Sequence, residues 1–207
     1  ILSVYTLLML EAYLAKKSPT QPIHWGNTDL KGIPIRFNGE RLATLAGVDN
    51  EENQDLAAQM ACLLHWKKLG ADETALIELD TQIEELHQQH TEFDWTGIYA
   101  LHEGKLHVLC FRGHATPHEV IEVNSGICGA AVNQNESINI ADVSADARYL
   151  SCDFRTKSEL VVPIRENGEA IAEIDIDSHH LDAFTPELQA NVEQLAKDLS
   201  SIVVRCR

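Results

Sequence analysis

The sequence predicts an α+β domain in which an antiparallel sheet of five or six strands is flanked by helices. Short runs rich in β-branched and aromatic residues occupy much of the stretch from residue 94 to residue 177. The turn residues Glu103-Gly104 and Asn167-Gly168 join two pairs of these runs into hairpins. Apolar residues at helical spacing precede this region and follow it.

The composition suits a globular protein and argues against some classes of partner. The chain has 207 residues, 44% of them hydrophobic, so it can bury a core of ordinary size. Its formal net charge of −16 at pH 7 repels phosphate backbones, so we expect no nucleic-acid partner. The five cysteines have no short spacing, and the pair His179 and His180 has no third ligand at a useful spacing. We therefore expect reduced thiols, no metal and no cofactor, and a solvated turn at the histidine pair.

The N-terminal part is predicted to be a helical extension, residues 1–70, before a domain that spans residues 71–207. Residues 1–17 have the spacing of an amphipathic helix. Their apolar stretch is too short to span a bilayer and lacks the basic start of a signal peptide, so we expect a cytoplasmic protein without a membrane segment. Residues 18–50, rich in Gly, Pro and Asn, are predicted to be mostly irregular, with one short strand near 33–37.

The positions of the other elements follow from apolar spacing and capping residues. Asn50 is a suitable N-cap for a helix over about 51–69, and a further helix is predicted over about 72–91. These helices serve as scaffold or as a homodimer interface. The predicted strands span residues 94–101, 105–113, 119–123, 137–143, 159–164 and 170–177. A short helix of small residues is predicted over 130–133, and Thr185 is a suitable N-cap for the last helix.

Two cysteines are candidate redox thiols. Cys152 lies in a segment without a strong period, which predicts a loop, and nearby cations would lower the pKa of its thiol. These cations are Arg148, Arg155 and Lys157. Cys128 lies between Gly126 and Gly129 at a predicted helix start, where backbone N–H groups favour a thiolate. An incidental thiol at position 152 and a small packing residue at position 128 are the alternatives.

Three acidic residues are candidate ligand-binding groups. Asp175 and Asp177 lie two apart on a predicted strand and share a face, and Glu159 begins another strand. Because such carboxylates repel each other, solvent, hydrogen bonds or a cation must compensate. A pocket for an ammonium group is one interpretation, and solvent-facing strand positions are the other. Trp95 and Tyr99, which share a strand face, wall an apolar pocket or belong to the core.

Five segments, in this order, resemble the free methionine-(R)-sulfoxide reductases, a family of enzymes with the GAF fold. They are DWTGIY (94–99), GICGAAV (126–132), CDFRTKSELVVP (152–163), EIDIDS (173–178) and FTPEL (184–188). The resemblance covers about residues 92–204, more than half of the chain. It implies a GAF-like antiparallel sheet flanked by helices, with an N-terminal extension added.

The resemblance also implies roles for the candidate residues. Cys152 matches the family's catalytic cysteine, which attacks the sulfoxide sulfur and becomes a sulfenic acid, and Cys128 matches a second family cysteine. The three acids match those that hold the free amino acid and help to deliver a proton to the sulfoxide oxygen. Trp95 and Tyr99 match the aromatic wall around the methyl group. Thioredoxin is the implied reductant.

One departure from the family bears on turnover. The usual resolving cysteine lies ten positions before Cys128, where this chain has His118. Resolution must therefore use Cys128 or an external thiol, or fail. Two functions remain open: reduction of free methionine-(R)-sulfoxide, and non-catalytic sensing of a small amino acid by a GAF-type module. A thioredoxin-coupled assay separates the two.

Overall fold

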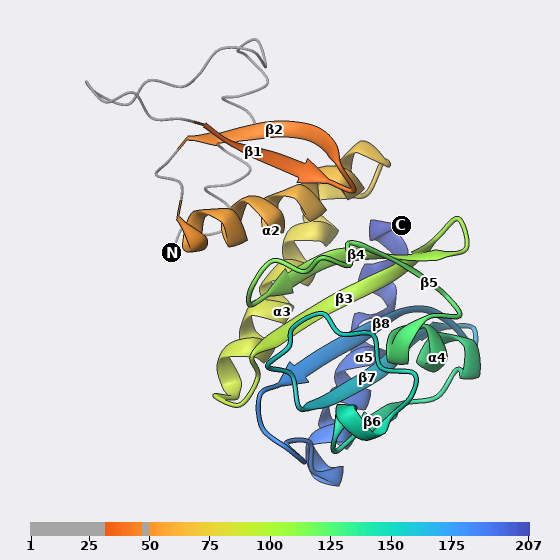
Figure 1. The fold of residues 1–207 in the computed structure, drawn as a ribbon. Helices are drawn as coiled ribbons and strands as arrows, with labels where there is room; N and C mark the ends of the chain where they lie inside the picture. Colours follow the sequence, from red (N-terminus) through yellow and green to blue (C-terminus); the bar gives the residue numbers. More distant parts are fainter. Residues whose placement is uncertain (1–31, 47–49) are drawn as a thin grey trace.

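The computed structural model describes residues 32–46 and 50–207 (Figure 1). The helix predicted over residues 1–17 lies outside these described residues. A six-stranded sheet with helices on both faces forms the body, and a separate two-stranded hairpin packs at one side (Figure 1). No helix within the described ranges is long and apolar enough to cross a membrane.

The six-stranded sheet has the order β5-β4-β3-β8-β7-β6, and every neighbouring pair is antiparallel. The strands are β3 Trp95–His102, β4 Lys105–Arg112, β5 Val120–Glu122, β6 Ile138–Ile140, β7 Ser158–Glu166 and β8 Glu169–Ser178. The turn between β7 and β8 has positive φ at Asn167 (52°) and Gly168 (87°), as a two-residue hairpin requires. The predicted antiparallel α+β fold is confirmed.

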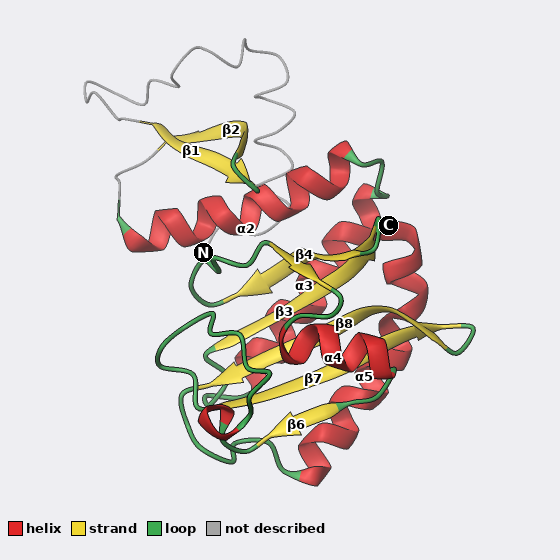
Figure 2. Cartoon of the chain, turned by 45° about the vertical axis from the view of Figure 1, so that its right-hand side comes forward, coloured by secondary structure: helices red, strands yellow, loops and turns green. Residues whose placement is uncertain are grey.

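Helices α3 (Glu73–Gln89) and α5 (Pro186–Cys206) cover one face of the sheet and enclose the larger core. Both helices begin at side-chain caps. Asp72 accepts a hydrogen bond from Ala75 N at 2.9 Å, and Thr185 accepts one from Leu188 N at 3.2 Å. Helix α4 (Gly126–Gln134) and the long loop between β6 and β7 lie over the opposite face (Figure 2). The candidate site lies on this second face.

The N-terminal extension differs from its prediction. It contains a hairpin of β1 (Gly32–Phe37) and β2 (Glu40–Ala46) packed on helix α2 (Glu51–Lys68), where the sequence analysis expected one strand. The missed signal is Asn38-Gly39, whose φ angles of 46° and 79° make the tight turn of a hairpin. Helix α2 in turn contacts β4, where Trp66 Nε1 donates to the Val108 carbonyl at 2.9 Å.

Candidate active site

Strand β8 carries a row of acidic side chains on the face that α3 and α5 do not cover. Alternate residues share a face, so Glu173, Asp175 and Asp177 form the row while the isoleucines between them enter the larger core. Glu159 on β7 stands opposite Asp177 in the strand register. All four side chains are buried, with 5% or less of each residue exposed. Glu173 adds a fourth acid to the predicted set of three. Its position two residues before Asp175, on the same face of the strand, was the signal in the sequence that could have identified it.

Helix α4 brings Cys128 against these acids. The helix begins at Gly126 rather than at residue 130, so Cys128 lies in its first turn. The Cys128 thiol donates to Asp175 Oδ2 at 3.4 Å and lies 3.9 Å from Glu159 Oε1. Gly129 permits the close approach of the helix, because a Cβ there would lie 2.9 Å from the backbone just after β5.

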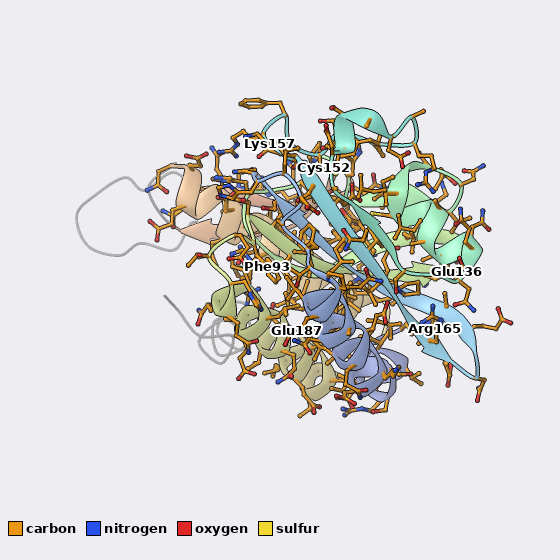
Figure 3. The ribbon with its side chains drawn as sticks, turned by 90° about the horizontal axis from the view of Figure 1, so that it is seen from below. Phe93, Glu136, Cys152, Lys157, Arg165 and Glu187 are labelled. Carbon is orange, nitrogen blue, oxygen red and sulfur yellow. The ribbon has the colours of Figure 1, made fainter. Side chains whose placement is uncertain are left out.

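A small cavity joins both candidate thiols to the acids. Its volume of about 10 Å³ is room for one water-sized particle. The five predicted residues with sulfur or carboxyl groups line it together: Cys128, Cys152, Glu159, Asp175 and Asp177. Leu150, which belongs to the same loop as Cys152, also lines it. Figure 3 shows Cys152 at the end of the molecule that carries Lys157, away from Arg165.

Trp95 lines a second cavity of about 40 Å³, which shares Cys152 and Asp177 with the first. The indole stacks on Phe111, with ring centroids 5.5 Å apart and an interplanar angle of 15°. It also covers Gly97, where a Cβ would lie 2.3 Å from the Trp95 ring. Trp95 is therefore a cavity wall whose position depends on the absence of a side chain beneath it.

Tyr99 and His118 connect Trp95 to the loop that carries Cys152. The Tyr99 ring centroid lies 6.0 Å from that of Trp95, but Tyr99 is fully buried and donates to the His118 carbonyl at 2.9 Å. His118 Nε2 lies 3.2 Å from the carbonyl oxygen of Ser151, the residue before Cys152. His118, ten positions before Cys128 in the sequence, thus contacts the backbone of the Cys152 loop.

The two arginines near Cys152 do not activate its thiol. Arg148 pairs with Asp146 at 2.6 Å, and Arg155 pairs with Asp153 at 2.6 Å. Burial raises the pKa of the Cys152 thiol, and the three cavity acids raise it further. The expectation of a lowered pKa is therefore wrong, because the arginines neutralise acids of their own loop while buried carboxyl groups face the sulfur.

The same environment acts on the other groups of the cavity. Burial raises the pKa of the Cys128 thiol well above its ordinary value, and the charge of Asp175 raises it further. The interpretation of Cys128 as a thiolate favoured by the helix start is therefore also wrong. Burial, and then the charge of Asp175, raises the pKa of the carboxyl groups of Glu159, Glu173 and Asp177. Groups of this kind keep their protons unless a positive charge comes near them.

His179 is part of the second cavity rather than of a solvated turn. Its Nδ1 lies 2.9 Å from Asp94 Oδ1, and its backbone N–H donates to Asp94 Oδ2 at 2.7 Å. Its Nε2 lies 3.8 Å from Asp153 Oδ2 in the Cys152 loop. The sequence did not reveal this contact, because only the pairing of β3 with β8 brings residues 94 and 179 together.

The N-terminal extension reaches the site through Asp55 of α2. Asp55 Oδ1 accepts a hydrogen bond from Ala115 N at 2.7 Å, and Oδ2 lies 3.0 Å from His114 Nδ1. The His114 carbonyl accepts a hydrogen bond from Trp95 Nε1 at 3.1 Å. Helix α2 therefore supports the segment that holds the Trp95 wall.

Comparison with known proteins places the chain in a family. Residues 69–203 match the GAF domain family. The chain is 31% identical over 118 residues to the free methionine-R-sulfoxide reductase of Escherichia coli (strain K12), covering 57% of this chain and 71% of the relative. It is 34% identical over 110 residues to the Saccharomyces cerevisiae (strain ATCC 204508 / S288c) protein of the same name, covering 51% and 61%. The solved structure of a type II free methionine-R-sulfoxide reductase from Thermoplasma acidophilum matches with a TM-score of 0.63 and 37% identity, covering 63% of this chain and 93% of that one. The chain therefore belongs to the GAF-domain family of free methionine-R-sulfoxide reductases.

Proposed function

We propose that the protein reduces free methionine-(R)-sulfoxide to methionine, with Cys152 as the nucleophile. The observation that carries the proposal is the cavity that two thiols share with three buried carboxyl groups. The relatives support the choice of substrate, because their names are those of free methionine-R-sulfoxide reductases.

The acids suit the ammonium group of a free amino acid. A cation that enters a buried cluster of carboxyl groups stabilises their charged forms. Its positive charge offsets the repulsion between the carboxylates and compensates for the solvation that they lost on burial. A cavity of about 10 Å³ does not hold an amino acid, so binding requires the segment around Leu150 and Cys152 to move. That segment, within residues 146–157, contains no helix or strand. Its displacement would join the two cavities that share Cys152 and Asp177.

Substrate binding also activates the thiol in this mechanism. Burial raises the pKa of Cys152 and the same acids add to this effect; the bound ammonium group offsets the charge of the acids, so substrate binding lowers that pKa and favours the thiolate. An acid of the cluster that does not pair with the ammonium group keeps its raised pKa and its proton, and it donates that proton to the sulfoxide oxygen. This coupling limits oxidation of Cys152 in the free enzyme.

The chemistry balances with two thiols and an external dithiol. Attack of Cys152 Sγ on the sulfoxide sulfur transfers the oxygen to Cys152, giving methionine and a sulfenic acid. Attack of the Cys128 thiol on Cys152 Sγ then forms a disulfide and releases water. A dithiol such as thioredoxin supplies the two electrons that restore both thiols.

Cys128 is the proposed resolving thiol. It lines the same cavity as Cys152. Cys110 is eight residues before position 118, where the family resemblance places a resolving cysteine. It packs in the larger core with α3 and α5, on the opposite side of the sheet from the cavity. His118 contributes a hydrogen bond to the Cys152 loop in place of a thiol.

The exposed side chain of Phe154 supports the proposal that the reductant is a protein. It lies two residues after Cys152 and is 93% exposed, an unusual position for a large aromatic side chain. Leu181, 59% exposed, is another large apolar side chain left in solvent. We propose that Phe154 contacts thioredoxin when the disulfide is reduced.

The homodimer and the cytoplasmic location stay predictions from the sequence. The domain boundary near residue 70 is also a prediction from the sequence.

Sensing of a small amino acid without turnover is the second candidate, and the raised pKa of both thiols favours it. A thioredoxin-coupled assay on both epimers of free methionine sulfoxide distinguishes the two. We expect consumption of the R epimer alone, loss of activity in Cys152→Ser, and loss of multiple turnover in Cys128→Ser. Cys62→Ser is the matched control, since Cys62 donates to the Ala58 carbonyl of its own helix, as a serine can. Methionine binding without turnover by the parent protein would establish the sensor instead.

A further inference from the structure

Cys128, Glu159 and Asp175 form a compact group of three potential metal ligands. One atom from each residue lies within 4.8 Å of the others, and each residue is buried. The three come from α4, β7 and β8, so that the fold rather than a sequence motif assembles them. Across the part of the chain that the structure describes, this is the one such group of three potential metal ligands.

The separations match those of a tetrahedral zinc site. A Zn–S bond of about 2.3 Å and a Zn–O bond of about 2.0–2.2 Å at the tetrahedral angle place sulfur and oxygen about 3.6 Å apart. The Cys128 Sγ lies 3.4 Å from Asp175 Oδ2 and 3.9 Å from Glu159 Oε1. Both sulfur–oxygen separations therefore lie within a few tenths of an ångström of the value for such an ion.

A second observation points to a ligand at this place. Asp175 is 3% exposed, and its Oδ1 has no hydrogen-bond partner among the described residues. Neighbouring Glu173 is fully buried, and neither of its carboxylate oxygens has a partner in the described ranges. Buried polar atoms without partners are costly, and a cation bound to the Asp175 carboxylate would lower that cost for this carboxylate. The adjoining cavity of about 10 Å³ has the size of one such particle.

We propose that Cys128, Glu159 and Asp175 form an exchangeable site for a thiophilic divalent cation of the zinc class. Mixed sulfur and oxygen ligands suit Zn²⁺ and its analogues Co²⁺ and Cd²⁺ better than they suit Mg²⁺ or Ca²⁺. Three protein ligands leave the fourth position to water. Binding replaces the Cys128 thiol proton by the metal, so the proton is released to solvent.

Such a site makes the protein sensitive to free metal. The cation occupies the acids that the substrate ammonium group would use, and it withdraws Cys128 from resolution. This consequence rests on the proposed reductase function, whereas metal binding itself does not. We expect Zn²⁺ to inhibit reduction competitively with methionine sulfoxide, and a chelator to reverse the inhibition.

Titration of the reduced, metal-free protein with Co²⁺ tests the site without any activity assay. Tetrahedral Co²⁺ bound to a thiolate gives visible d–d bands and an ultraviolet thiolate-to-cobalt charge-transfer band. We expect both at one equivalent in the parent protein and in the control variant Cys62→Ser. Cys128→Ser should lose the charge-transfer band. Asp175→Asn, which keeps the side-chain shape, should weaken binding by at least about tenfold, since even outer-shell changes cost about 10–100-fold.

Each outcome has a distinct meaning. The proposal fails if the parent protein gives no charge-transfer band, or if Cys128→Ser keeps it. It also fails if Asp175→Asn binds Co²⁺ as tightly as the parent, because the ion then lies elsewhere. A protein that binds Co²⁺ in this way yet never turns over methionine sulfoxide refutes the proposed reductase function and leaves the metal site intact.

Discussion

The substitution Gly97→Ala tests whether the Trp95 wall depends on an empty position beneath it. The added methyl carbon would lie 2.3 Å from Trp95 Cη2 and 3.0 Å from Phe111 Cβ. Carbon atoms in contact prefer about 3.5–4.0 Å, so the indole must move by more than about 1 Å. Overpacking of this kind costs about 1–3 kcal/mol. At about 2–4 °C per kcal/mol for a chain of this size, we expect Tm to fall by about 2–12 °C.

The displaced indole should also change catalysis, because Trp95 lines the cavity beside Cys152. We expect a higher KM for methionine sulfoxide in Gly97→Ala. Trp95→Phe removes the indole atoms nearest the new methyl group, so the double variant should recover part of the lost stability. A double-mutant cycle followed by thermal unfolding should give a favourable coupling of about 1–3 kcal/mol. An unchanged Tm in Gly97→Ala, or strictly additive losses in the double variant, would refute this reasoning.

Three further predictions address the surroundings of the site. Phe154→Ser should raise KM for thioredoxin several-fold, while turnover with a small dithiol stays unchanged. Asp55→Ala removes two contacts to the segment over residues 113–118 and should raise KM for methionine sulfoxide with less effect on kcat. A buried carboxyl group with a raised pKa holds its proton when the unfolded chain has lost it, so stability falls as pH rises above the unfolded pKa of about 4.3. Glu173→Gln should therefore flatten the decline of Tm between pH 5 and 8, and the exposed Glu169→Gln should not.

These three have clear contrary results. Equal KM values for thioredoxin in parent and Phe154→Ser would remove that residue from the docking surface. Unaltered kinetics in Asp55→Ala would show that the segment needs no support from α2. If the parent protein becomes more stable between pH 5 and 8, or if Glu173→Gln keeps the parent's pH profile, the buried carboxyl groups do not control stability in the way described.

Local pattern and residue chemistry were sufficient for the six-stranded sheet and its flanking helices. The alternation of β8 placed Asp175 and Asp177 on one face, and that inference needs nothing beyond the geometry of a strand. The caps at Asn50 and Thr185 likewise depend on neighbours within three residues. The first hairpin was missed although the Asn-Gly turn signal is local, because the composition of the surrounding segment favoured an irregular chain.

The acidity of the site could not be predicted in the same way. Three cations lie near Cys152 in the sequence, and they suggested a lowered thiol pKa. In the fold those arginines pair with acids of their own loop, while carboxyl groups from distant strands face the sulfur. A pKa depends on what lies within a few ångströms in space, and neighbours along the chain are a poor guide to that.

The residue types of the site and the faces they occupy are thus properties of the sequence. The packing of strands and helices decided which of them meet. These contacts join Cys128 with Asp175, Asp94 with His179, and Asp55 of α2 with the segment after β4. The physical reason is range. Strand alternation and capping act over two to four residues, whereas burial, cavity shape and a three-ligand cation site arise only when elements far apart in the chain pack together.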